Sequence, residues 1–330
     1  MLDILYLIGG LVVLIFGGDF LVRGATNIAY KAKISPLVVG LTIVAFGTSA
    51  PELVVSLSSV YENPGICIGN VVGSNICNLS LVLGATAIFF PIAVTSGTIK
   101  VDWGMTIGSA LLLYFFVSAD SMLKPFEGFI LFLILIIYTY YLIETSRRDA
   151  KLNDGSEIDE DLREEYDEAM ASNVWKELAY LFGGIVLLFL GGQKFVEGAV
   201  GIAKTLQVSD EIIGLTVVAL GTSFPELITS VIAATKKNTD LAIGNLLGSC
   251  IFNVFSILGI TSMVKAVTVS TSVINFDMTI MVGIILLLLP IMISKKRVSS
   301  FEGVILLLIY IAYTTYKVLG AMGVSLDFFE

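Results

Sequence analysis

Apolar residues in this chain fall into ten long runs, and a short polar or charged segment closes each of them. An α-helix needs about 20 mainly apolar residues to cross the hydrocarbon core of a bilayer. The pattern therefore predicts an all-α multi-pass membrane protein with ten transmembrane helices. We expect these helices at residues 3–22, 36–59, 66–91, 102–118, 125–144, 176–197, 210–235, 241–266, 275–294 and 300–320.

Composition and loop charge agree with this pattern and orient it. Hydrophobic residues make up 56% of the chain and charged residues only 14%, which is more apolar surface than a soluble domain needs. With an external N-terminus, most of the 19 Lys and Arg residues fall on the cytoplasmic side, as the positive-inside rule predicts. We expect a cell-membrane protein with both termini extracellular. The first run carries Asp3 and follows no basic residue, so we expect it not to be a cleaved signal.

The net charge of −9 comes mainly from one segment. Acidic residues crowd the stretch from Asp149 to Glu168, whereas the rest of the chain is close to neutral. We expect residues 146–174 to form a solvated acidic cytoplasmic linker, and the stretch has no EF-hand spacing. The charge therefore says nothing about partners of the membrane part. We expect no nucleic-acid partner and no obligate protein partner, only the lipid bilayer and small cations.

The chain repeats itself, and the second copy is inverted. Residues 7–56 align with residues 181–230 without a gap, and 25 of these 50 positions are identical. One insertion later, GNVVGS from Gly69 aligns with GNLLGS from Gly244. We expect two five-helix repeats, residues 1–145 and 175–330. An odd number of helices places the second repeat upside down in the membrane, an architecture of many secondary transporters whose substrate site lies where the halves meet.

One motif places polar groups inside the second run. In AFGTSAPEL, Thr48 and Glu52 are four residues apart and stack on one face of a helix, with Ser49 beside them. Pro51 has no N–H and frees backbone carbonyls near Ala45. Lipid cannot satisfy these carbonyls, so they must face protein or a cavity. The second repeat has the same arrangement in ALGTSFPEL, with Ala219, Thr222, Ser223, Pro225 and Glu226.

The following helix of each half adds a second polar stripe. Ser74 and Asn78 are four residues apart, as are Ser249 and Asn253. The two asparagines suit ion ligation slightly better than helix–helix hydrogen bonding. A lone Ser, Thr or Pro in a membrane helix is usually structural, but an intramembrane acid is functional by default, and here it occurs twice in matching frames.

The available ligands are oxygen atoms. Carboxylates, hydroxyls, amide oxygens and carbonyls suit hard cations such as Ca²⁺ and Na⁺. The chain has no His and its three cysteines form no CxxC pair, which excludes zinc sites and histidine proton relays. No Lys or Arg lies near Glu52 or Glu226, so a bound cation is the simplest compensation for two charges in lipid.

Two sets of small residues have no single interpretation. Glycine pairs occur in the first helix of each half, at Gly9–Gly10 and Gly17–Gly18 and at Gly183–Gly184 and Gly191–Gly192. They fit either tight packing or a smooth surface for sliding. Cys77 and Cys250 border the polar stripes, where packing of a small side chain is the simpler role; Cys67 suggests no function.

The two motifs together resemble the α-repeats of the sodium/calcium exchanger family within the cation/Ca²⁺ exchanger superfamily. GTSAPE…GNVVGSNICN and GTSFPE…GNLLGSCIFN carry the resemblance, and it extends over essentially the whole chain. It implies α-repeats at about 36–91 and 210–266 and antiport of Na⁺ against Ca²⁺ by alternating access. It also implies that the first and sixth helices slide across the rest. The ions would be transported substrates, and no cofactor is expected.

The same resemblance implies the ligand set. Glu52 and Glu226 would be carboxylates shared by Ca²⁺ and Na⁺, and hydroxyls, amides and two backbone carbonyls would complete the cluster. The remaining expected ligands are Ser49, Ser223, Thr48, Thr222, Ser74, Ser249, Asn78, Asn253 and the carbonyls of Ala45 and Ala219. If three Na⁺ exchange for one Ca²⁺, as is common in the family, transport is electrogenic.

Several alternatives remain open from the sequence. Potassium-dependent relatives typically have Asp where this chain has Asn253, and proton-coupled relatives have GNxxE where it has GNVVG and GNLLG, so both couplings are disfavoured. A passive cation channel is a less favoured reading. An intramembrane enzyme is disfavoured further, because HExxH, GxGD and Ser/His arrangements are missing. Flux direction, stoichiometry and oligomeric state are not encoded in these patterns.

Overall fold

All ten predicted spans are present as helices. The computed structural model describes residues 2–61, 64–152, 160–208, 210–322 and 324. Within these residues, eight continuous helices are long and apolar enough to cross a membrane, and two bent helix pairs bring the number to ten. The bent pairs are Pro36–Thr48 with Ala50–Ser59, at 44°, and Thr216–Thr222 with Phe224–Thr235, at 47°. Both contain the polar motif that the sequence places inside an apolar run.

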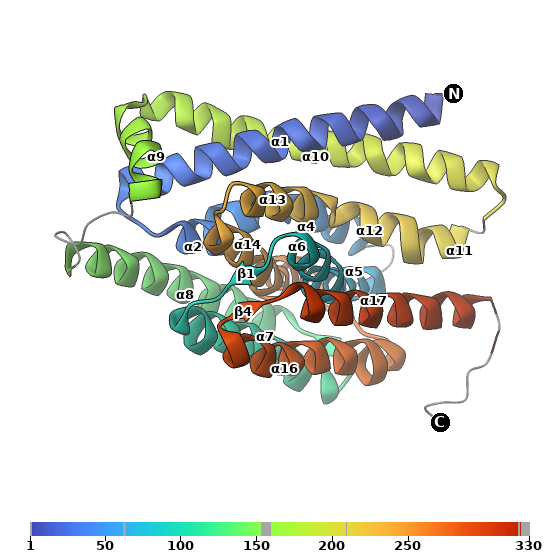
Figure 1. Cartoon of the computed structure of the whole chain (residues 1–330). Helices are drawn as coiled ribbons and strands as arrows, with labels where there is room; N and C mark the ends of the chain where they lie inside the picture. Colours follow the sequence, from blue (N-terminus) through green and yellow to red (C-terminus); the bar gives the residue numbers. More distant parts are fainter. Residues whose placement is uncertain (1, 62–63, 153–159, 209, 323, 325–330) are drawn as a thin grey trace.

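The first half runs from α1 to α8 (Figure 1). Its elements are α1 (Leu2–Ala32), α2 (Pro36–Val39), the π-helical turn η1 (Gly40–Val44), α3 (Ala45–Thr48), α4 (Ala50–Ser59), α5 (Pro64–Cys77), η2 (Asn78–Val82), α6 (Leu83–Phe89), β1 (Ile92–Ala93), η3 (Thr98–Asp102), α7 (Trp103–Ser118), β2 (Met122–Leu123) and α8 (Pro125–Leu152).

The second half repeats this order after one extra helix. Its elements are α9 (Glu160–Ala171), α10 (Val174–Thr205), α11 (Asp210–Ile213), η4 (Gly214–Val218), α12 (Ala219–Thr222), α13 (Phe224–Thr235), α14 (Thr239–Phe252), η5 (Asn253–Leu258), α15 (Gly259–Val264), β3 (Val267–Thr268), η6 (Val273–Asp277), α16 (Met278–Lys295), β4 (Arg297–Val298) and α17 (Ser300–Ala321).

Two short antiparallel ladders join the halves. Strand β1 pairs with β4, with Ile92 opposite Val298, and β2 pairs with β3, with Leu123 opposite Val267. Under the shift of 175 that aligns Gly69 with Gly244, these two contacts are the same contact with the halves exchanged. The two five-helix repeats are therefore inverted copies related by a pseudo-two-fold axis.

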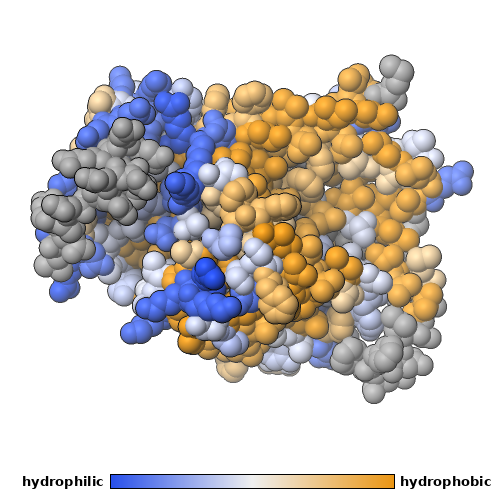
Figure 2. Space-filling model, viewed as in Figure 1, coloured by the Kyte–Doolittle hydropathy of each residue, from blue (hydrophilic) through white to orange (hydrophobic). Residues whose placement is uncertain are grey.

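Helix α14 lies at the centre of the protein, where the apolar core surrounds it. The most apolar stretch of the span Thr239–Val264 is entirely buried, whereas only 11% of the corresponding stretch of Ser300–Ala321 is buried. Helix α14 packs against α2, η1, α3 and α13. Exposed apolar side chains cover much of the surface seen in Figure 2, and hydrophilic residues gather at the end where α9 lies. This distribution suits a protein whose membrane-spanning zone faces lipid.

Helices α1 and α10 lie antiparallel and touch backbone to backbone (Figure 1). A Cβ on Gly17 would lie 2.8 Å from Leu188 N and 3.1 Å from Gly184 O. A Cβ on Gly184 would lie 2.8 Å from Gly17 O in return. Close packing thus accounts for one glycine of each pair. A Cβ on Gly18 would instead meet Ile228 of α13, while nothing lies within 4 Å of one on Gly9.

The segment predicted as an acidic linker is partly helical. Helix α8 continues to Leu152, eight residues past its predicted end, and α9 covers Glu160–Ala171. Residues 153–159 of the predicted linker lie outside the described part of the chain. Lys31 at the end of α1 donates to the carbonyl of Met170, at 3.1 Å, and to that of Ser172, at 2.7 Å. These bonds tie the end of α9 to α1.

A buried carboxylate in each half shows where the symmetry breaks. Asp277 accepts a hydrogen bond from Tyr313, at 3.0 Å, and forms an ion pair with Lys317, at 3.0 Å. Its counterpart Asp102 accepts from Tyr138, also at 3.0 Å, but the position that corresponds to Lys317 is Leu142. Only one of the two aspartates therefore has a lysine at this position.

Replacing Lys317 by leucine is expected to destabilise the protein by about 1–3 kcal/mol, because it leaves the charge of Asp277 without its cation. Leucine occupies the equivalent place in the other half, so the side chain itself fits. The measurement is the thermal midpoint of purified protein in detergent. Lys194→Leu is the control, since Lys194 pairs with Glu197 at the surface and should contribute little. Equal midpoints for the two variants would contradict the prediction.

Candidate functional site

Both polar motifs break their helices at a serine. Helix α3 ends at Thr48, Ser49 has φ −83° and ψ 6°, and α4 begins with Pro51 in its first turn. Ser223 has φ −89° and ψ 2° between α12 and α13, which begins with Pro225. A proline fits the first turn of a helix because the N–H it lacks has no partner there. Each motif thus ends one helix and starts another inside the membrane.

The break places each glutamate in the first turn of a new helix. Glu52 lies in the first turn of α4 and Glu226 in that of α13. Both residues are completely buried. The positive end of the helix dipole favours a carboxylate at this position and offsets part of the cost of burial. The two carboxylates lie close enough to each other to interact electrostatically.

Hydroxyls from both halves surround each carboxylate. Ser49 of the first half donates to Glu226 Oε1 of the second, at 3.1 Å. The hydroxyls of Thr48 and Ser249 also lie beside Glu226. Around Glu52 the arrangement is exchanged, with Ser74 from its own half and Thr222 from the other. The pseudo-two-fold axis therefore passes between the two glutamates.

Several buried oxygen atoms of this cluster lack hydrogen-bond partners among the described residues. They are both carboxylate oxygens of Glu52, Oε2 of Glu226, the hydroxyl of Ser223 and the amide oxygens of Asn78 and Asn253. A buried polar atom without a partner costs about 1–3 kcal/mol, and more when it is charged. Buried atoms left without partners in this number require an explanation. In the described part of the chain, no group of three or more His, Cys, Asp or Glu side chains gathers, so hydroxyl and amide oxygens must supplement the two glutamates.

The two backbone carbonyls of the predicted ligand set differ in what the structure describes. The Ala45 carbonyl accepts from the N–H of Ser49, at 3.0 Å, and from the hydroxyl of Thr48, at 3.3 Å. It is therefore less free than the position of Pro51 suggests. The backbone of Ala219 begins α12, but its side chain lies outside the described part.

Asparagines that brace the glutamates were missed by the sequence analysis. Asn245 donates to the Glu226 carbonyl, at 3.5 Å, and to Ser230, at 3.0 Å, and its Oδ1 accepts from Thr48, at 3.2 Å. Asn70 holds the Glu52 carbonyl, at 3.4 Å, in the same way. The sequence did contain a signal for these asparagines. In both repeats, a Gly-Asn pair places its Asn four residues before the serine of the polar stripe, and a Ser follows the glutamate by four residues.

Asn78 and Asn253 begin the two π-helical turns η2 and η5. Both are completely buried, and each lies one turn beyond the serine of its stripe. Nothing in the apolar pattern distinguishes a π-turn from an α-helix, so the sequence did not predict these turns. Single π-turns inside α-helices often occur at functional sites because they turn side chains out of the regular helical positions.

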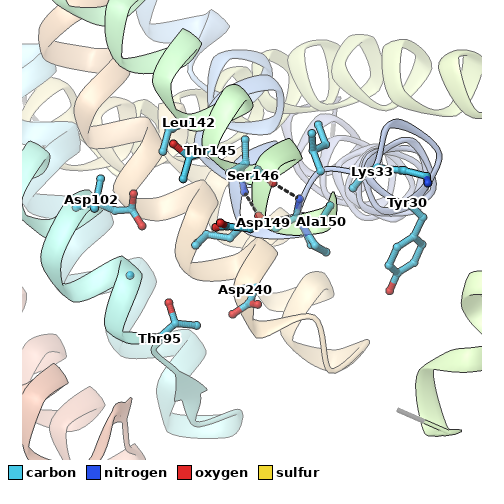
Figure 3. Close-up of a pocket in the computed structure, with 18 of the residues that line it drawn as sticks. Tyr30, Lys33, Thr95, Asp102, Leu142, Thr145, Ser146, Asp149, Ala150 and Asp240 are labelled. Carbon is cyan, nitrogen blue, oxygen red and sulfur yellow. Dashed lines mark hydrogen bonds between the residues drawn. The ribbon is translucent and has the colours of Figure 1, made fainter. Parts of the chain in front are cut away.

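Two cavities approach the protein interior from different places. One of about 290 Å³ is lined by α4, α10, α12 and α13 and reaches Thr222, Pro51 and Pro225 of the broken helices. A larger one, of about 710 Å³, lies at the α9 end and contains none of the predicted ligands. Figure 3 shows Asp102, Asp149 and Asp240 around this larger cavity, with Lys33 on its other side. The smaller cavity is lined by the prolines that precede the two glutamates.

Comparisons with known proteins point to one family. The chain matches the family described as sodium/calcium exchanger protein over residues 2–144 and 176–319. It is 37% identical to the putative antiporter CaxA of Alkalimonas amylolytica, over 94% of this chain and 96% of that protein. It is 32% identical to the sodium/calcium exchanger MaX1 of Methanosarcina acetivorans, over 94% and 97%. A solved structure of the sodium-calcium exchanger NCX_Mj superposes with a TM-score of 0.79, 31% identity and coverage of 96% and 98%.

Proposed function

The chain belongs to the sodium/calcium exchanger family, and from this we propose that it is an antiporter that exchanges Na⁺ for Ca²⁺ by alternating access. The observation that carries the proposal is the meeting of Glu52 and Glu226. Each comes from one inverted half, and hydroxyls of both halves lie beside each. A site shared by two inverted halves can be reached from either side when one part of the protein moves against the other.

The chemistry of the site favours hard cations. Its donors are carboxylate, hydroxyl, amide and carbonyl oxygens, which Ca²⁺ binds with about 6–8 ligands. Two carboxylates in the membrane cost about 2.5–3.5 kcal/mol each on insertion scales, and a cation between them offsets that cost. The proposed ligands are Glu52, Glu226, Ser49, Ser223, Thr48, Thr222, Ser74, Ser249, Asn78, Asn253 and the carbonyls of Ala45 and Ala219.

Exchange follows from shared ligands. Two negative charges balance one Ca²⁺ or two Na⁺, so the two kinds of ion compete for the same oxygens. We propose that the 290 Å³ cavity between α4 and α10 is the route to this site. The positive-inside rule supports extracellular termini and a cytoplasmic acidic segment. The route, which lies toward the end of α10 opposite to α9, would then open on the extracellular side.

The experiment that tests this function uses proteoliposomes. Vesicles loaded with Na⁺ are diluted into Na⁺-free buffer that contains ⁴⁵Ca²⁺, and uptake of the label is followed. We expect uptake that depends on the outward Na⁺ gradient and that stops when Na⁺ is equal on both sides. A passive channel would conduct Ca²⁺ without this dependence, and that result would contradict the proposal.

Exchange is expected to respond to membrane voltage. If three Na⁺ move against one Ca²⁺, one net charge crosses per cycle, which is worth about 2.3 kcal/mol per 100 mV. During Ca²⁺ uptake into Na⁺-loaded vesicles this net positive charge leaves the vesicle. A valinomycin-clamped K⁺ gradient that makes the interior positive should therefore accelerate uptake, and one that makes the interior negative should slow it. Uptake that is indifferent to the clamp would contradict electrogenic exchange.

Coupling to K⁺ or H⁺ is the second candidate. Asn253 stands where potassium-dependent relatives typically have an acid, so we propose that exchange needs neither ion. Uptake from K⁺-free buffer, with no change in intravesicular pH, is the expected result. A requirement for added K⁺, or Ca²⁺ uptake driven by a pH gradient alone, would overturn it. We propose no cofactor, no enzymatic activity and no obligate protein partner for this cycle.

A further inference from the structure

A hydrogen-bonded chain crosses the pseudo-two-fold axis beside the glutamates. Asn75 of α5 donates through Nδ2 to the backbone carbonyl of Cys250, at 3.2 Å. Asn253 in turn donates through Nδ2 to Asn75 Oδ1, at 3.0 Å. Asn75 and Asn253 are both buried, so water does not compete for these bonds. The chain joins the first half to the second.

The bond to Cys250 determines the orientation of both amides. A backbone carbonyl only accepts hydrogen bonds, so Asn75 must present its Nδ2 to it. The Oδ1 of Asn75 then faces Asn253, which must present its own Nδ2. The Oδ1 of Asn253 is left without a partner among the described residues. The orientation of one side-chain amide thus decides which atom of the next one remains available.

Asn253 lies on the face of the helix that carries the site. Asn253 follows Ser249 by four residues, so the two side chains share one face. The Ser249 hydroxyl lies 3.4 Å from that of Thr48 and beside Glu226. An oxygen at this position can bind a cation, whereas an NH₂ group would repel it.

The symmetry-related pair of hydrogen bonds is missing among the described residues. Asn78 corresponds to Asn253, and Asn75 corresponds to Cys250 under the shift of 175. Cys250 Sγ lies 4.0 Å from the Asn75 carbonyl, and a thiol is only a weak donor and acceptor. Neither amide atom of Asn78 has a partner among the described residues. The hydrogen bonds therefore fix the orientation of the Asn253 amide, whereas none among the described residues fixes that of the Asn78 amide.

We propose that Asn75 is a positioning residue that holds Asn253 with its amide oxygen toward the transported cation. The inference rests on the proposed function and extends it to a residue outside the ligand set. Asn75 does not touch the ion. It makes Asn253 a preorganised ligand, so binding does not have to reorient the amide, and it makes the two halves of the site unequal despite their repeated sequence.

A double-mutant cycle tests this role through Ca²⁺ affinity. Asn75→Ala is measured in the natural background and in an Asn253→Asp background, with ⁴⁵Ca²⁺ binding to purified protein in Na⁺-free detergent buffer. In the natural background we expect binding to weaken about ten-fold or more, the usual effect of losing a partner that orients a ligand. With aspartate at position 253 both terminal atoms are oxygens, so Asn75→Ala should change affinity less than about two-fold.

Matched controls separate positioning from packing. Cys250→Ala removes the side chain at the symmetry-related position and should leave Ca²⁺ affinity unchanged. Thermal midpoints show whether each variant is folded, and Asn75→Leu, whose side chain is close to asparagine in size, replaces the alanine variant if that one is not. A similar loss of affinity in both backgrounds would show a packing role and overturn the proposal, as would no loss in the natural background. Failure of Na⁺-driven uptake in the wild-type chain, with the cycle as expected, would refute the exchange function alone.

Discussion

Replacing either Glu226 or Glu52 by glutamine is expected to abolish Na⁺-driven Ca²⁺ uptake. Each substitution removes one of two negative charges from a completely buried site. At an effective dielectric constant of about 20, a unit charge pair 4 Å apart interacts by about 4 kcal/mol, and a divalent ion loses more than a monovalent one. We therefore expect Ca²⁺ affinity to fall by more than about 100-fold in either variant. Uptake of ⁴⁵Ca²⁺ into proteoliposomes and Ca²⁺ binding in detergent are the two measurements.

The control for this substitution is the same change at the surface. Glu127 accepts a hydrogen bond from the N–H of Lys124, at 2.7 Å, at the start of α8 and far along the chain from either motif. Glu127→Gln should leave uptake unchanged. The two glutamates should also behave alike, because the surrounding hydroxyls are exchanged between the halves. Transport that survives in either Glu52→Gln or Glu226→Gln would contradict the proposed ion site.

Adding one methyl group to Gly17 or Gly184 is expected to destabilise the protein strongly. A Cβ at either position would clash with the backbone of the opposite helix, at 2.8 Å from Leu188 N for Gly17 and at 2.5 Å from Leu21 N for Gly184. Backbone atoms cannot rotate away as a side chain can, so α1 and α10 must separate along their length. Overpacking of this kind costs typically about 1–3 kcal/mol, and Gly17→Ala with Gly184→Ala should exceed either alone. Thermal midpoints in detergent measure the loss.

Neighbouring glycines provide the matched control. Gly9 and Gly183 belong to glycine pairs of the same two helices, but nothing lies within 4 Å of a Cβ built on either. Alanine at these positions should be neutral or stabilising by up to about 1 kcal/mol, since glycine is a poor helix former. If Gly9→Ala lowers the midpoint as much as Gly17→Ala, the close contact is not what the glycines serve. Transport by the stable Gly9→Ala protein should equal that of the wild type.

This contact also bears on how access could alternate. Helices α1 and α10 are joined by backbone contacts between symmetric glycines, while Gly18 faces the side chain of Ile228 on α13. We propose that the pair moves as one unit over the rest of the protein. Asp19 pairs with Lys236, at 2.5 Å, and Asn238 donates to Thr26, at 3.0 Å, so polar bonds between α1 and the α13–α14 connection would have to break during this movement.

The sequence alone determined the framework of this protein. Apolar runs of membrane-spanning length predicted all ten helices, because only a helix satisfies its backbone hydrogen bonds within one segment in lipid. The repeat of 25 identities in 50 positions and the odd number of helices per copy predicted the inversion. The two motifs predicted which residues would gather, since an acid beside a helix-breaking proline has no other reason to recur in a membrane segment.

Tertiary structure alone decided how those residues are shared and held. A repeat suggests two equal halves, so it does not reveal that Asn253 bonds to Asn75 while Asn78 has no amide partner among the described residues. Nor does it reveal that Lys317 pairs with Asp277, whereas the position equivalent to Lys317 in the other half is Leu142. Nor does periodicity distinguish π-turns from α-helix, or glycines that meet backbone from glycines that meet nothing. Such differences arise from contacts between different segments of the chain, 40 residues apart for Lys317 and Asp277 and 178 for Asn75 and Asn253, and a pattern along one segment carries no information about its partner's side chains.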